Sequence, residues 1–149
     1  MRTTSRRQFT VQAIALLAAA WLPQLGAAQL SGASPRQRVV FQVSDAEPVK
    51  WSLALNNIRN IQDDLGGSDA VDIELVAYGP GIGILKGDSP LAQRVAEALK
   101  AGVKVVACEN TMRNQKLVHA DMLPNIGYVP AGVVELMRKQ QQGYAYIRP

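Results

Sequence analysis

The stretch "VDIELVAYGPGIGILKGDSPLAQRVAEALKAGVKVVAC", residues 71–108, contains the pattern that decides the fold. Two aliphatic runs, 71–78 and 103–108, flank a helix-like segment over 89–102, in which Ser89 is expected as the cap and Pro90 in the first turn. Parallel strands need a crossover connection, and helical crossovers bury both faces of the sheet, so such strands are aliphatic runs rather than clean alternations. The stretch therefore predicts a strand–helix–strand unit in a parallel sheet.

The same alternation precedes this unit. Residues 38–44 form a β-branched run, and a helical pattern follows over 47–67. Pro48 suits the first turn of that helix, and Gly66 can end it in the left-handed conformation. Apolar residues spaced by three and four predict one core-facing stripe: Trp51, Leu55, Ile58, Ile61 and Leu65.

After the unit come a helical segment over 111–122, a short strand near Tyr128, a helix over 131–142 and a last strand over 144–149. A chain of 149 residues is the usual size of one domain. Alternating strands and helices predict a flavodoxin-like α/β three-layer sandwich with a five-stranded, mostly parallel sheet.

The first 28 residues have the pattern of a signal peptide: a basic segment, an apolar run over 11–22, and small residues ending at Ala28. Within it "SRRQFT", residues 5–10, resembles the twin-arginine export motif. A retained anchor is the alternative, but about 12 apolar residues fall short of the roughly 20 that span a bilayer. We expect cleavage near Ala28, a flexible tether over 29–37, a domain over 38–149, and a periplasmic protein with no stable membrane span.

The basic charge belongs mainly to this leader. The chain has 16 basic and 12 acidic side chains and a net charge of +4. The leader holds three of the basic side chains and none of the acidic ones, so the remainder has 13 basic and 12 acidic side chains. Basic and aromatic residues are not interleaved, and no nucleic-acid partner is predicted.

Cys108 is the only cysteine, so it cannot form an internal disulfide in an oxidising compartment. It ends a predicted strand, at the sheet edge where α/β proteins bind ligands. A following helix, capped by Asn110 or Thr111, would favour the thiolate, whereas the charge of Glu109 opposes it. Burial as a small hydrophobe, pairing with another molecule and use as a reactive thiol all remain open.

The loop "YGPGIGILKG", residues 78–87, follows the other strand of the unit. Its glycines Gly79, Gly81 and Gly83 could bring backbone N–H groups close to an anion or a sulfur substituent, with Lys86 as a positive charge. The alternative is a tight turn at the sheet edge. The spacing of nucleotide-binding loops is absent, which disfavours nucleotide binding.

No metal or other cofactor is predicted. His119 is the only histidine, so a His-rich metal site and a conventional Cys/His pair would both depend on one residue. Its setting, "VHAD", indicates a solvated side chain. Asp63, Asp64 and Asp121 are interpreted as solvated residues rather than acid/base groups.

Three motifs resemble the DsrE/DsrF-like family in order and spacing: "AYGPGIGIL", "VVACENTM" and "AGVVELMRKQQQGYAYIRP". The resemblance implies a small α/β sandwich that assembles as trimers or hexamers, with sulfur carried by some members as a persulfide on a cysteine. It implies Cys108 as the catalytic residue. Tyr78 stands where the family often has histidine in "AHGPG". The expected substrate-binding residues are Asn110, Thr111, Tyr78, Gly79 and Gly81.

Two function hypotheses follow. The first is a periplasmic sulfur carrier or sulfurtransferase that holds sulfane sulfur as a persulfide on Cys108, and its partners are a sulfane-sulfur donor and an acceptor thiol. The second is a non-catalytic module that binds a small ligand or assembles with other subunits, with Cys108 as packing. The terminal segment, with Tyr144, Tyr146 and Ile147, would expose apolar surface at a sheet edge, which predicts a homo-oligomer.

Overall fold

The computed structural model describes residues 36–149. Within this range the chain forms a five-stranded sheet of order β4-β3-β2-β1-β5, and every strand pair is parallel. The predicted α/β fold with a parallel sheet between helices is confirmed. The strands are β1 (Gln37–Val43), β2 (Val71–Ala77), β3 (Lys104–Cys108), β4 (Gly127–Val129) and β5 (Ala145–Ile147).

The expected leader lies outside the described residues, and so does most of the expected tether. β1 begins at Gln37, the last residue assigned to that tether. The N–H of Gln37 donates to the carbonyl of Ala70 at 3.0 Å, so this position is already part of the folded domain.

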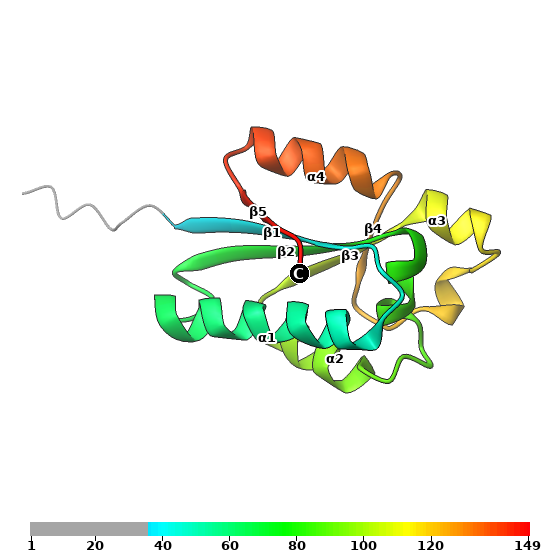
Figure 1. Ribbon diagram of the computed structural model, residues 1–149, viewed down its shortest axis with the longest axis horizontal. Coiled ribbons are helices and arrows are strands. Elements are labelled where there is room, and N and C mark those ends of the chain that lie inside the picture. Colours follow the sequence, from blue (N-terminus) through cyan, green and yellow to red (C-terminus); the bar gives the residue numbers. More distant parts are fainter. Residues whose placement is uncertain (1–35) are drawn as a thin grey trace, which may run out of the picture. The chain divides into compact units, whose positions relative to one another are not determined.

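Helices cover both faces of the sheet (Figure 1). α1 (Pro48–Leu65) and α2 (Ala92–Lys100) lie on one face, and α4 (Gly132–Gln141) lies on the other. The larger part of the core is between the sheet and the first two helices, where Phe41, Ile58 and Leu75 are fully buried or nearly so. A smaller cluster lies beneath α4: Val40, Val76, Leu136 and Tyr144.

One charged residue of β2 is buried under α4. The side chain of Glu74 is 4% exposed, and Lys139 of α4 approaches its Oε2 to 2.6 Å. Glu135 lies 3.6 Å from the same ammonium group. A charge can be buried when it is paired, so this contact lets an acidic residue occupy an otherwise aliphatic strand.

α1 begins and ends at the residues that the sequence predicts, but its last turn does not face the core as predicted. Pro48 occupies the first turn, and Gly66 closes the helix in the left-handed conformation, with φ of 93°. Trp51, Leu55 and Ile58 are buried. Leu65 is 39% exposed, so the core-facing stripe ends before the helix does.

The predicted start of α2 is wrong by two residues, because the observed cap is Leu91 and not Ser89. The helix begins at Ala92, and Ser89 precedes it in a turn that the Ala92 N–H closes by donating to the Ser89 carbonyl at 3.1 Å. The Ser89 hydroxyl accepts from the N–H of Leu91 at 3.3 Å. Ser89 and Pro90 therefore form the approach to the helix and not its first turn.

The predicted helix over 111–122 is shorter and begins earlier. α3 spans Glu109–Asn114, and its cap is Cys108 rather than Asn110 or Thr111. Lys116 adopts a left-handed φ of 56°, and the Leu117 N–H donates to the Met112 carbonyl at 2.9 Å. This closing pattern satisfies the last carbonyls and stops the helix.

Among residues 36–149 we found no helix with the length and apolar character needed to cross a membrane.

Candidate functional site

Cys108 lies at the carboxyl edge of the sheet, between β2 and β4. It is the last residue of β3 and the cap of α3. The residue is 5% exposed, and its thiol is free. Its register partner on β4 is Val129, so the connection from β4 to α4 begins beside the sulfur.

The surroundings of Cys108 act on the pKa of its thiol in two directions. Burial raises the pKa, but hydrogen bonding from the Thr111 hydroxyl and from the backbone N–H groups of Gly132, Thr111 and Asn110 outweighs burial and holds the pKa below its ordinary value. Because the donors belong to the starts of both α3 and α4, two helix ends favour the thiolate. The arrangement can stabilise a sulfur nucleophile and also a departing thiolate.

Thr111 connects the glycine loop to the sulfur. The N–H of Gly79 donates to Thr111 Oγ1 at 2.9 Å, and Thr111 is 9% exposed. Since this bond occupies a lone pair of the hydroxyl, the single hydroxyl proton is free to point at Cys108. Gln115 closes the group by donating to the Gly79 carbonyl at 3.1 Å.

Asn110 is the second residue of α3, two positions after Cys108. Its side-chain carbonyl accepts a hydrogen bond from Arg113, one turn later in α3. Its N–H donates to the carbonyl of Pro130 at 3.2 Å. Asn110 thus joins the α3 start to the loop that leads into α4.

The glycine loop itself is a 3-10 helix, η1 (Gly79–Leu85). A Cβ on Gly81 would lie 2.3 Å from the carbonyl oxygen of Val43, so glycine is needed for this close approach. A Cβ on Gly83 would lie 2.7 Å from the Trp51 ring. Gly79 reaches the site through Thr111, whereas the contacts of Gly81 and Gly83 are those of a tightly packed turn.

Tyr78 lies between the glycine loop and α4. Its N–H donates to the Val43 carbonyl at 3.1 Å, which fixes its backbone at the end of β2. Its side chain is packed against Gly132, where an added Cβ would lie 3.1 Å from the Tyr78 Cβ and 3.2 Å from Cδ1. Tyr78 therefore packs against the first residue of α4.

Gly132 is the site residue that the sequence did not identify. The glycine of "PAG", at the start of the helix predicted over 131–142, was the only available sign, because a backbone N–H carries no side-chain signature. Pairing of β4 with β3 places Val129 beside Cys108, so the connection into α4 begins there.

His119 lies in the neighbouring turn η2 (His119–Asp121), and its side chain is 63% exposed. Its ring stacks on Tyr128 of β4, with centroids 3.8 Å apart. Its Nε2 is 3.9 Å from Glu109 Oε1. The histidine is thus solvent-exposed, as predicted, but it also packs on an aromatic ring. No group of three or more potential metal ligands is assembled among the described residues.

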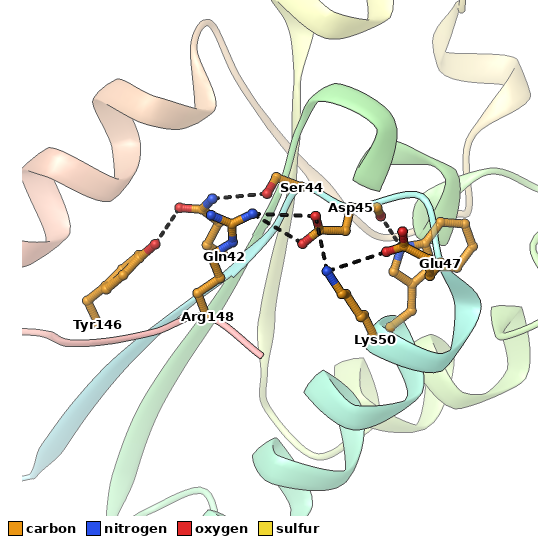
Figure 2. Close-up of polar contacts among 8 residues, drawn as sticks. Gln42, Ser44, Asp45, Glu47, Lys50, Tyr146 and Arg148 are labelled. Atoms are coloured by element: carbon orange, nitrogen blue, oxygen red, sulfur yellow. Dashed lines mark hydrogen bonds and ion pairs between the residues drawn. The ribbon is translucent and has the colours of Figure 1, made fainter.

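A second polar cluster occupies the same sheet edge at β1 and β5 (Figure 2). The Tyr146 hydroxyl donates to Gln42 Oε1 at 2.6 Å, and Arg148 lies 3.3 Å from Asp45. Lys50 pairs with Asp45 from the start of α1, also at 3.3 Å. These contacts attach the short edge strand β5 and the residues after it to the end of β1.

The model of the DsrE/DsrF-like family matches residues 37–149. The chain belongs to the DsrE/DsrF-like family. This family is linked to sulfur transfer. The match spans the whole sheet and both helix starts that surround Cys108. The comparison with curated proteins found no match.

Solved structures share this DsrE/DsrF-like fold. A protein of unknown function, MTH1491 from Methanobacterium thermoautotrophicum, is 36% identical, with a TM-score of 0.71 over 76% of this chain and 99% of its own. BT1422 from Bacteroides thetaiotaomicron, also of unknown function, is 12% identical, with a TM-score of 0.63 over 76% of this chain and 95% of its own. The ychN protein of E. coli is 16% identical, with a TM-score of 0.58 over 76% and 99%. The last two similarities concern the fold alone.

Proposed function

We propose that this protein is an exported sulfur carrier that holds sulfane sulfur as a persulfide on Cys108. The observation that carries the proposal is a buried free thiol at the carboxyl edge of the sheet, at the end of β3 and the start of α3, in a family linked to sulfur transfer. Hydrogen bonding at this position lowers the pKa of the thiol. Donors that favour the thiolate increase the nucleophile available at neutral pH. They also make Cys108 a better leaving group, since a thiol of lower pKa leaves faster.

Loading is a displacement on sulfur. The Cys108 thiolate forms a bond to the terminal sulfur of a donor persulfide, the donor S–S bond breaks, and the donor leaves as a thiolate with the electron pair. The proton stays on the transferred sulfur. In release, an acceptor thiolate attacks that sulfur and Cys108 departs as a thiolate. One sulfane sulfur moves between thiols, so no external oxidant or reductant is consumed.

The direct test is a mass measurement on purified protein incubated with polysulfide. Wild-type protein should gain the mass of one or more sulfur atoms, and a reducing thiol should remove it. Cys108→Ser is the matched control and should gain nothing. Because Cys108 is the only cysteine, any persulfide must be on this residue. A wild-type thiol that stays unmodified under these conditions contradicts the carrier function.

The near-complete burial of Cys108 favours a second candidate, a non-catalytic binding or assembly module. In that case the thiol should resist alkylation until the protein is denatured. A carrier thiol should instead react in the native protein at neutral pH. The two candidates therefore give opposite results in one alkylation experiment.

We also propose a homo-oligomer, a trimer or a multiple of one. Three large apolar side chains are exposed on the α4 face of the sheet: Val133, Met137 and Tyr146. They border a shallow groove of about 410 Å³ that also contains Gln42 and Tyr78. A neighbouring subunit would remove this apolar surface from water.

Export to the periplasm completes the proposal. It rests on the leader sequence, with its paired Arg6 and Arg7 and the small residues before Ala28. In that compartment a lone cysteine has no internal disulfide partner, so it is available for exchange with donor and acceptor sulfur.

A further inference from the structure

The chain encloses Cys108 almost completely, with 5% of the residue exposed. β2 pairs Ala77 with Ala107, so the chain that leaves β2 at Tyr78 passes beside the cysteine, and Val129 pairs with it on the other side. A displacement on sulfur brings the attacking and attacked sulfur atoms into contact. The proposed reaction therefore requires a contact at this edge of the sheet to open.

One contact at this edge joins α3 to η1 through side chains. The Gly79 N–H donates to Thr111 Oγ1 at 2.9 Å, and Gln115 Nε2 donates to the Gly79 carbonyl at 3.1 Å. Thr111 and Gln115 are four positions apart, which places them on one face of α3 and its end. We call these three residues the Gly79 latch. η1 is also fixed on its far side, where the Gly81 N–H donates to the Ser44 carbonyl at 3.1 Å, so opening of the latch means that α3 separates from η1.

The position of α3 depends on such contacts, because a helix of six residues is too short to be stable alone. A backbone bond from the Asn110 N–H to the Pro130 carbonyl holds its start. The latch holds its remaining length, and within the latch the Thr111 bond is partly buried whereas the Gln115 bond is exposed to solvent. Exposed hydrogen bonds are typical of the parts of a protein that open most easily, so the Gln115 bond should break first.

We propose that Gln115 controls access to Cys108: its hydrogen bond to the Gly79 carbonyl holds α3 against η1, and release of this bond admits the sulfur donor and acceptor. The proposal deepens the carrier function and rests on it for its biological meaning. Its physical content, the access of a reagent to one thiol, can be measured without any sulfur transfer.

The test is the rate at which iodoacetamide alkylates Cys108 in the native full chain, over a pH series up to the plateau. Cys108 is the only thiol, so all alkylation of cysteine reports this residue. On the plateau the thiol is fully ionised, and the rate follows the population of the open form. Gln115→Glu keeps the size of the side chain and removes its donor. The plateau rate should rise about five-fold, which corresponds to the loss of one hydrogen bond of about 1 kcal/mol.

Gln62→Glu is the matched control. Gln62 Nε2 also forms an exposed bond to a distant carbonyl, that of Ala101, at 2.8 Å. Ala101 precedes β3 and Cys108 ends it, so the control bond lies at the opposite edge of the sheet. This variant undergoes the same chemical change and should keep the wild-type plateau rate. Gln115→Ala removes the donor without adding a charge, and it should be accelerated as Gln115→Glu is.

A wild-type plateau rate in both Gln115 variants would overturn the proposal. The same acceleration in Gln62→Glu would also overturn it, because the rate would then report a general loosening of the fold. Polysulfide loading separates this failure from that of the carrier function. If only the latch fails, wild-type protein acquires sulfur and every variant is alkylated at the wild-type rate. If only the carrier function fails, wild-type protein never acquires sulfur, and the accelerated alkylation of the Gln115 variants remains.

Discussion

Replacing Lys139 by methionine would remove the ammonium group that faces Glu74 beneath α4. In the native structure Lys139 Nζ lies 2.6 Å from Glu74 Oε2, with side chains 12% and 4% exposed. Glu74 Oε1 is buried and has no hydrogen-bond partner among the described residues. The variant therefore leaves a buried carboxylate without a counter-charge, beside the carboxylate of Glu135.

The burial of Glu74 decides how much unfolding free energy the Lys139→Met variant loses. An exposed ion pair contributes about 0–1 kcal/mol, whereas removal of one partner of a buried pair costs about 3–5 kcal/mol. At 4% exposure Glu74 belongs to the second class, and we expect a loss near 3 kcal/mol at pH 7. The lower end applies because Glu74 can escape part of the cost by taking up a proton.

The pH dependence follows from that proton. Burial already raises the pKa of Glu74 against the lowering effect of Lys139, and loss of Lys139 raises it further. A folded-state pKa above the unfolded one stabilises the fold fully below the unfolded pKa, and this contribution is lost as the pH rises through the folded pKa. The difference in unfolding free energy between wild type and Lys139→Met should therefore shrink as the pH falls from 7 towards 4.

Urea unfolding of the full chain at pH 7 and pH 5 measures both effects. Lys104→Met is the matched control, because Lys104 forms a pair of 3.2 Å with Asp72 but is 56% exposed, and it should lose at most about 1 kcal/mol. Adding Glu74→Gln to Lys139→Met should recover most of the loss. A loss below about 1 kcal/mol at pH 7, or the same loss at both pH values, would refute the reasoning.

Three further predictions concern the thiol, the assembly and the leader. Thr111→Val should raise the midpoint of the pH profile of Cys108 alkylation by iodoacetamide by about one pH unit, while Thr111→Ser keeps the hydroxyl and should leave that midpoint unchanged. Met137→Glu should lower the molar mass seen by light scattering, and Val49→Glu, at a position 74% exposed on α1, should leave it unchanged; a monomeric wild type would contradict the assembly. Replacing both Arg6 and Arg7 by lysine should leave the precursor inside the cell, as cell fractionation would show, and normal export would contradict the twin-arginine assignment.

Local patterns in the sequence were sufficient to predict the strands and helices and their order along the chain. The aliphatic run of 71–77 and the three-and-four spacing in 51–58 report which faces are buried, and burial is what selects strand or helix at these positions. The strand end at Cys108 was likewise predictable, because the apolar run stops there. Helix ends were less predictable: the cap of α3 is Cys108 itself, a residue with no preference for capping.

The sequence by itself determined a parallel α/β domain with a lone cysteine at the edge of its sheet. Only the tertiary structure decided what surrounds that cysteine, because the same succession of strands and helices is compatible with several strand orders. Pairing of β4 with β3 brings the Pro130 carbonyl to the N–H of Asn110 beside Cys108, and packing of α4 on the sheet brings Lys139 to Glu74. Both contacts join residues far apart in the chain, and a backbone N–H or a buried charge becomes favourable only when its distant partner is present.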